Sequence, residues 1–190
     1  MVIKIPIEIS ARHVHLSQED LELLFGSGYE LKKAKELNQP GQFAAQETVV
    51  IRFGDKEITS VRVVGPLRQK TQLEISLTDA YALGAAATIK EDSGYVKVAP
   101  GILLIGPQGQ LELKQGALVA LRHLNASLEE AKELGVKDND MVSIRIKGIR
   151  DLTFHNVRAR VGDNYKLSVH LDTDEGNAAG LTQNGFGEIV

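Results

Sequence analysis

Short segments of alternating apolar and polar residues recur along the chain, and turns that contain glycine or proline separate them. Such alternation is typical of strands with one buried face, because successive side chains point to opposite faces of a strand. Hairpins are predicted where two such segments flank a short turn, at 48–53 with 57–64, 101–106 with 110–114, and 141–147 with 152–161. Many short strands joined by tight turns favour barrels or a sandwich over an open α/β sheet.

Helices are expected to be few and short. Residues 17–25 and 127–134 each begin with serine, have an acidic residue three positions later and end at a glycine. This pattern is typical of a capping box followed by a C-terminal glycine. One more short helix is predicted over 78–83, and an acidic turn after His170 is expected to open another. Residues 28–46 are predicted to form a loop with some helix.

Two segments of the chain repeat each other: "ARHVHLSQEDLELLFG" at 11–26 aligns with "LRHLNASLEEAKELG" at 121–135. Four identities recur at the same offset: Arg12 with Arg122, His13 with His123, Ser17 with Ser127, and Glu19 with Glu129. Convergence of two strand-to-helix turns on one capping chemistry would explain the serines and the acidic residues, but not the matched arginine and histidine. We therefore favour a pseudo-repeat with two related halves. The telling mismatch is His15 against Asn125.

The composition narrows the classes of function. With 43% hydrophobic and 25% charged residues and a net charge of −3, the chain is typical of a soluble globular protein and has no basic field for nucleic acid. It contains no cysteine, so a metal would be held by His, Asp, Glu or Asn. The longest apolar run, residues 82–87, is too short to cross a membrane, and no signal-peptide core is visible. The sequence therefore predicts a cytoplasmic protein with neither nucleic-acid nor membrane partners.

The H-x-H motif of His13 and His15 places two imidazoles on one face of an extended chain. Two such groups can hold one metal ion, and they can equally be polar residues near a strand end. Glu74 is the candidate third ligand, because a catalytic zinc site often combines two histidines with one carboxylate. His170, at a predicted strand end, is well placed for ligation. His155, in mid-strand, is interpreted as a surface residue.

Arg68 lies in a loop directly before the strand that carries Glu74. A guanidinium group can bind phosphate through two parallel hydrogen bonds. On spacing alone, a solvated surface loop is the favoured interpretation. The predicted helix starts at Ser17 and Ser127 also offer backbone N–H groups to an anion.

Four segments carry a resemblance to a known family: "SARHVHLS", "GPLRQKTQLEISLTDA", "GPQGQLELKQGALVALRHLNAS" and "VHLDTDEGNAAG". Together, and in order from about Ile5 to Gly180, they resemble the PduL-type phosphotransacylases, also called phosphate propanoyltransferases. The resemblance implies a mainly β fold with short capping helices and two β-barrels. It implies that residues 12–120 form one barrel and residues 1–11 with 121–190 the other, with a two-metal site, normally zinc, between them.

The resemblance also implies roles for six residues: His13, His15 and Glu74 as ligands of one zinc ion, His123 and His170 as ligands of a second, and Arg68 as the phosphate-binding arginine. The chain departs from the family at Asn125, where a histidine is usual. Because an amide oxygen binds zinc less well than an imidazole does, one firm zinc site and one uncertain site are expected, with Asn125 at best a weak ligand. Members in bacterial microcompartments, which serve propanediol degradation, carry an extra N-terminal segment, and none is visible here.

The activity implied is acyl-CoA + phosphate ⇌ acyl phosphate + CoA, with propanoyl-CoA or acetyl-CoA as the short-chain substrate and CoA as a substrate or product. Two alternatives stay open from the residues alone. One is a metal-dependent hydrolase on the same ligands. The other is a degenerate, non-catalytic family member that only binds a metal or ligand. The resemblance also leaves room for a homo-oligomer.

Overall fold

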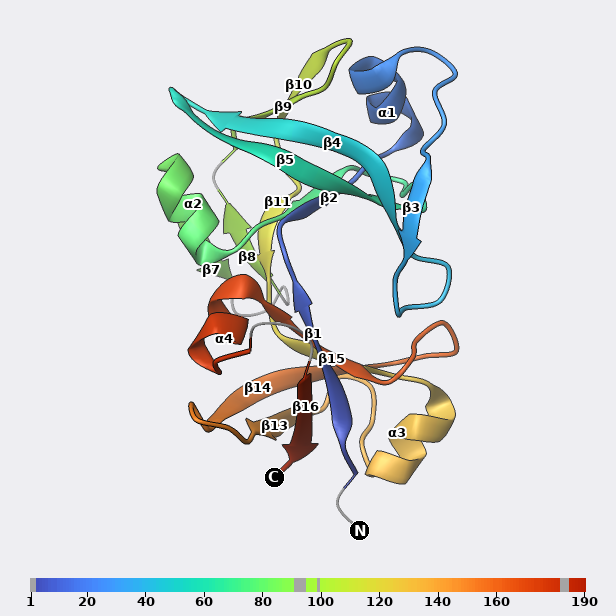
Figure 1. Cartoon of the computed structure of the whole chain (residues 1–190), viewed down its shortest axis with the longest axis vertical. Helices are drawn as coiled ribbons and strands as arrows, with labels where there is room; N and C mark the ends of the chain where they lie inside the picture. Colours follow the sequence, from blue (N-terminus) through green and yellow to red (C-terminus); the bar gives the residue numbers. More distant parts are fainter. Residues whose placement is uncertain (1–2, 91–94, 99, 182–184) are drawn as a thin grey trace. The chain divides into compact units, whose positions relative to one another are not determined.

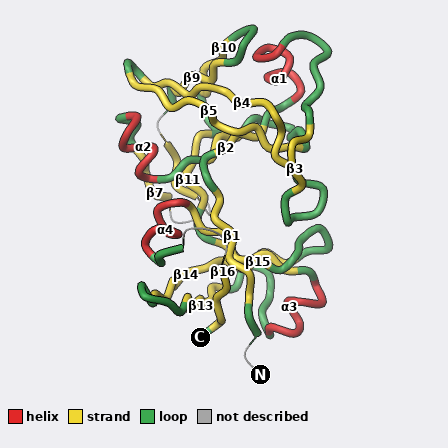
Figure 2. The backbone as a smooth tube through the Cα atoms, in the orientation of Figure 1, coloured by secondary structure: helices red, strands yellow, loops and turns green. Residues whose placement is uncertain are grey.

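The computed structural model describes residues 3–90, 95–98, 100–181 and 185–190. Strands make up a much larger part of the backbone than helices, which are few and short (Figure 2). The chain divides into two compact units, Arg12–Ala120 and Met1–Ala11 with Leu121–Val190. The predicted mainly β fold with short capping helices is therefore confirmed. Among the residues that the structure describes, no helix has the length and apolar character that a membrane crossing needs.

The unit Arg12–Ala120 is one sheet with the strand order β10-β9-β4-β5-β2-β6-β11-β8-β7, and β3 pairs with β4 beside this path. Its strands are β2 His13–His15, β3 Lys33–Glu36, β4 Phe43–Phe53, β5 Lys56–Gly65, β6 Gln72–Glu74, β7 Ala87–Lys90, β8 Tyr95–Val98, β9 Ile102–Ile105, β10 Gln110–Leu113 and β11 Ala117–Ala120. Its helices are α1 Gln18–Phe25 and α2 Leu77–Leu83. Figure 1 shows β4 and β5 as a long, curved pair, and the sheet curls like part of a barrel.

The other unit is a closed barrel with the strand order β1-β15-β12-β14-β13-β16 (Figure 1). Its strands are β1 Ile5–Ser10, β12 His123–Ala126, β13 Met141–Ile146, β14 Leu152–Val161, β15 Ser168–Asp172 and β16 Gly185–Ile189, and its helices are α3 Leu128–Leu134 and α4 Thr173–Ala178. One apolar core fills it, and its fully buried members include Ile7, Leu124 and Val169. The N-terminal strand β1 belongs to this barrel through β15 and β16.

The three predicted hairpins form as the antiparallel pairs β4–β5, β9–β10 and β13–β14. The predicted helix starts are also confirmed: the Ser17 and Ser127 side chains accept hydrogen bonds from the backbone N–H groups of Asp20 and Glu130. The helix predicted over 78–83 forms as α2, and the acidic segment after His170 opens α4. His170 does not end its strand as predicted but lies in the middle of β15, because pairing with β1 continues to Asp172.

The prediction for residues 28–46 is wrong in part. This region contains the strand β3 and the first residues of β4, and no helix. All of β3 is exposed, so its sequence KAKE has no apolar alternation that could indicate a strand. The strand exists because its backbone pairs with β4, with Glu36 opposite Phe43.

The pseudo-repeat is visible in the strand pairing of both units. Strand β2 pairs in parallel with β5 and antiparallel with β6. Strand β12 likewise pairs in parallel with β14 and antiparallel with β15. Helices α1 and α3 follow β2 and β12, while α2 and α4 follow β6 and β15. Two capped turns that had merely converged would not share these partners and directions, so the halves are related by a repeat of the whole strand–helix arrangement.

Candidate metal centres

His13, His15 and Glu74 converge in the unit Arg12–Ala120, as a result of strand pairing. His13 lies opposite Glu74 in the antiparallel pair β2–β6. Their neighbours in sequence, Val14 on β2 and Leu73 on β6, also lie opposite each other and are fully buried in the core. Because side chains alternate along a strand, the two histidines and the glutamate share the face that points away from this core.

The three side chains have the spacing of a metal site, and we call them the first centre. Their ligand atoms all lie within 4.8 Å of one another. His13 Nε2 lies 3.7 Å from Glu74 Oε2, and the two imidazole rings are 5.0 Å apart at 86°. Two ligands of a tetrahedral zinc ion, each bound at about 2.0–2.1 Å, lie about 3.3 Å from each other. The distance between His13 Nε2 and Glu74 Oε2 therefore needs a contraction of only about 0.4 Å to fit zinc, and the other ligand atoms lie near enough to join them after side-chain adjustment.

His15 is prepared for metal binding by its surroundings. It is buried, and its Nδ1 lies 2.9 Å from the carbonyl oxygen of Val64. A carbonyl only accepts, so Nδ1 carries the proton and Nε2 keeps its lone pair for a metal. Burial, with smaller effects from the nearby Arg68 and His13, lowers the pKa of His15 to about 3. The ring is therefore neutral at pH 7, which is the form that binds a metal.

Arg68 lies beside this centre, although its loop is distant from the H-x-H motif in sequence. Its backbone N–H donates to the carbonyl of Leu16, which follows the motif directly. Its Nη1 donates to Gln72 Oε1 at 3.2 Å and lies 4.0 Å from Glu74 Oε1. Gln72 in turn donates to Glu74 Oε1 at 2.8 Å. A guanidinium group that is 37% exposed thus stands next to the proposed ligands, where an anion can reach it.

His123 and His170 form a second cluster, in the closed barrel. They lie opposite each other on β12 and β15, and their rings stack at 5.0 Å and 19°. His123 Nδ1 lies 2.9 Å from the carbonyl oxygen of Leu121, which again leaves Nε2 as the lone-pair nitrogen. Burial, with smaller effects from Arg160 and His170, lowers the pKa of His123 to about 3. Its environment therefore matches that of His15.

Asn125 lies where the repeat places the counterpart of His15. It is 4% exposed, and its Oδ1 has no hydrogen-bond partner among the described residues. An unsatisfied buried acceptor costs about 1–3 kcal/mol, so this atom is expected to have a partner such as an ion. Asn125 shares one face of β12 with His123, which lies opposite His170 on β15. Among the described residues, the three His or acidic ligand atoms that lie within 4.8 Å of one another are those of the first centre.

A matched pair of salt bridges ties each histidine strand to a helix. Arg12 Nη2 lies 2.7 Å from Asp79 Oδ1, and Arg122 Nε lies 2.8 Å from Glu175 Oε1. Both acidic residues are the third residues of helices that follow ligand-bearing strands, α2 and α4. The arginines were visible in the sequence repeat, but their partners were missed, because no local pattern connects them. Burial raises the pKa of Glu175 to about 7, although Arg122 acts to lower it.

Two other findings concern residues outside these clusters. His155, predicted to be a surface residue, is exposed on β14 and contacts Ser143 Oγ through Nδ1 at 2.7 Å.

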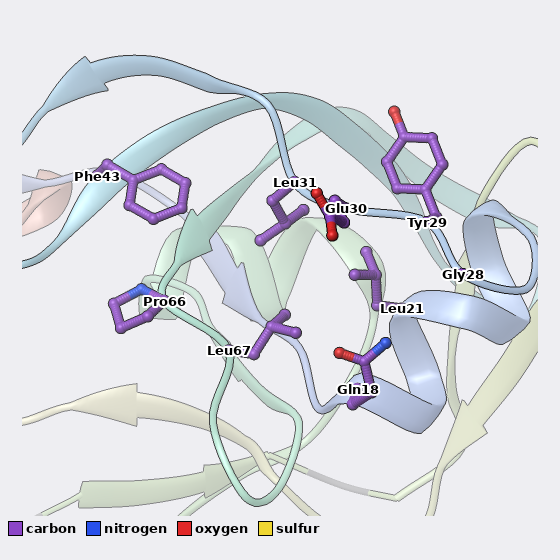
Figure 3. A pocket seen from close by; sticks show the side chains of 9 residues that line it. All are labelled: Gln18, Leu21, Gly28, Tyr29, Glu30, Leu31, Phe43, Pro66 and Leu67. Atoms are coloured by element: carbon purple, nitrogen blue, oxygen red, sulfur yellow. The ribbon is translucent and has the colours of Figure 1, made fainter.

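A cavity of about 360 Å³ in the unit Arg12–Ala120 has a mostly apolar lining (Figure 3). It is lined by Gln18, Leu21, Gly28, Tyr29, Glu30, Leu31, Phe43, Pro66 and Leu67. Pro66 and Leu67 directly precede Arg68, so the cavity and the arginine share one loop.

The metal-free protein is expected to lose stability as the pH falls from about 6.5 towards 3. His15 and His123 have folded-state pKa values of about 3, below the usual 6.5, so the unfolded chain takes up their protons first. Their contribution is complete above pH 6.5 and falls by up to roughly 1.4 kcal/mol per pH unit for each histidine. Urea denaturation of chelator-treated protein at pH 7.5 and 5 measures this fall. The variant with both His15→Gln and His123→Gln should show a shallower fall, and an equal fall would contradict the assignment.

Fold and first centre together define the class of this protein: a two-unit β protein with the two-histidine, one-carboxylate set that metal-dependent enzymes use. A family model described as phosphate propanoyltransferase matches residues 6–182. This chain belongs to the phosphate propanoyltransferase family, and it is an acyltransferase. The resemblance seen in the four sequence segments is confirmed.

Relatives match over nearly the whole chain. The phosphate propanoyltransferase of Thermotoga maritima is 48% identical over 185 residues, which cover 97% of this chain and 88% of that protein. That of Salmonella typhimurium is 47% identical over 188 residues, covering 98% and 89%. That of Lachnoclostridium phytofermentans is 45% identical over 187 residues, covering 98% and 85%. The family match therefore covers both units.

Proposed function

We propose that this acyltransferase interconverts a short-chain acyl-CoA and phosphate with an acyl phosphate and CoA, and that its first centre holds zinc. Propanoyl-CoA and acetyl-CoA are the proposed substrates, because the relatives are named for propanoyl transfer and the one methylene that separates the two acyl groups is discriminated by the shape of the acyl pocket. The observation that carries the proposal is the convergence of His13, His15 and Glu74 beside the exposed guanidinium of Arg68.

The reaction needs groups that stabilise the negative charges of phosphate and of the transition state, and it needs no nucleophilic side chain. A phosphate oxygen attacks the thioester carbonyl carbon, the carbon–sulfur bond breaks, and the CoA thiolate leaves and takes up a proton. A zinc ion supplies Lewis acidity, which stabilises the negative charge that develops on oxygen or sulfur. Arg68 would hold phosphate by two N–H donors and offset its charge, which otherwise opposes approach to the thioester. No residue is covalently modified, in keeping with a chain without cysteine.

We also propose a second zinc centre at His123 and His170. In the first centre the second position of the motif is the imidazole of His15, whereas here it is the amide of Asn125. An amide oxygen is a weaker ligand for zinc than an imidazole nitrogen. Two imidazoles and one amide would hold zinc less firmly than the first centre does, unless another residue contributes.

Two alternatives make different predictions in one assay. The assay follows thiol release from propanoyl-CoA and acetyl-CoA with and without phosphate, with arsenate in a third series. A transferase releases CoA only when phosphate or arsenate is present. A metal-dependent hydrolase on the same ligands releases CoA without either anion. A degenerate, non-catalytic member is the other alternative, and the weak ligand Asn125 is the reason to consider it. Such a protein releases no CoA, although elemental analysis still detects bound metal.

A further inference from the structure

We propose that Glu8 is a protein ligand of the second centre, together with His123 and His170. The carboxylate would supply there the third strong donor that Asn125 does not. This inference rests on the second centre of the proposed function and identifies a ligand for it. Sequence reasoning missed Glu8, because its only local signal is alternation with the apolar residues of β1.

Strand pairing places the three side chains in one row. Glu8 on β1 lies opposite His170 on β15, and His170 lies opposite His123 on β12. Their neighbours in sequence are core residues of the barrel, fully buried: Ile7, Leu124 and Val169. Because side chains alternate, Glu8, His170 and His123 all lie on the outer face of the barrel, on three adjacent strands.

Two spacings repeat those of the first centre, although the three ligand atoms do not all lie within 4.8 Å of one another, as those of the first centre do. Glu8 Oε2 lies 3.7 Å from His170 Nε2, and Glu74 Oε2 lies 3.7 Å from His13 Nε2. The ring centroids are 5.0 Å apart in both histidine pairs. Each unit therefore holds two imidazoles and one carboxylate, the combination that leaves an open position on a catalytic zinc ion.

The second set differs in orientation. Its rings are nearly parallel, so their in-plane lone pairs do not converge on one point, whereas the rings of the first centre are nearly perpendicular. His170 Nε2 also lies 3.0 Å from Ser168 Oγ, and this hydrogen bond must break before Nε2 can bind a metal. A rotation of an imidazole is therefore required, and the second centre should bind more weakly than the first. The unsatisfied Oδ1 of Asn125 is a further oxygen donor on the same face.

The test is the zinc content of the full chain. The protein is loaded with zinc, dialysed to remove the excess, and measured by elemental analysis. The unmodified protein is expected to hold about two zinc ions per chain and Glu8→Gln about one, since glutamine keeps the shape but removes the charge. Glu133→Gln, an exposed residue of α3, removes the same charge and should keep two. Cobalt loading gives a second readout, because loss of a carboxylate changes the visible absorption of bound Co²⁺.

A rescue variant makes the test specific. Adding Asn125→His to Glu8→Gln should restore about two zinc ions, because an imidazole replaces the lost carboxylate as the third strong donor. If Glu8 only forms an ion pair with His170, Glu8→Gln keeps the zinc content of the unmodified protein, and the inference is overturned. A loss of zinc in His123→Ala but not in Glu8→Gln would overturn the role of Glu8 and leave the second centre standing. No loss in either variant would reject the second centre itself.

Discussion

His13→Ala and His15→Ala are each expected to lose the zinc of the first centre and to slow thiol release by about a hundredfold or more. The reason is that Lewis-acid stabilisation is worth several kcal/mol, and each 1.36 kcal/mol changes a rate tenfold. Glu74→Gln tests the same centre with almost no change in shape. Since His15 is buried, His15→Gln is the variant that avoids leaving a cavity, and circular dichroism checks that it folds.

His155→Ala is the matched control for the histidine variants. His155 is exposed, belongs to neither cluster and should keep both the metal content and the rate. Full zinc content and full rate in His13→Ala or His15→Ala would reject the first centre. A loss of activity with the zinc retained would instead assign the histidines a role in contact with the substrate.

Arg68→Lys is expected to raise the Michaelis constant for phosphate by about tenfold or more, although the charge is kept. A lysine ammonium is a point charge and cannot form the two parallel hydrogen bonds of a guanidinium. The loss of one hydrogen bond to a charged group costs about 1.5–3 kcal/mol. The Michaelis constant for acyl-CoA should change much less, because Arg68 is proposed to contact phosphate.

Lys70→Arg provides the control within the same loop, because Lys70 is exposed and carries no proposed role. Steady-state thiol release, with phosphate and acyl-CoA varied separately, yields both constants for each variant. If Arg68→Lys leaves the phosphate dependence unchanged, Arg68 is only a surface residue that supports Gln72 and Glu74. That result would leave the first centre intact and require another phosphate-binding group.

The sequence alone determined the local structure wherever the physical cause is local. Alternation predicted the hairpins, because each strand must bury one face. The serine and acidic residues predicted the starts of α1 and α3, because a cap satisfies the backbone N–H groups of its own helix. The H-x-H spacing also placed His13 and His15 on one face, a consequence of strand geometry. The family resemblance was carried by residues in order along the chain.

Only the tertiary structure decided which strands are neighbours and in which register. The backbone hydrogen bonds that pair strands are the same for every residue, so they do not name a partner in the sequence. Pairing alone made β3 a strand and brought Glu74 beside His13. It also brought Glu8 beside His170 and Asp79 within reach of Arg12. The contacts of Glu74, Glu8 and Asp79 join residues that are far apart in the chain, and burial of the two apolar cores fixes the register that makes them.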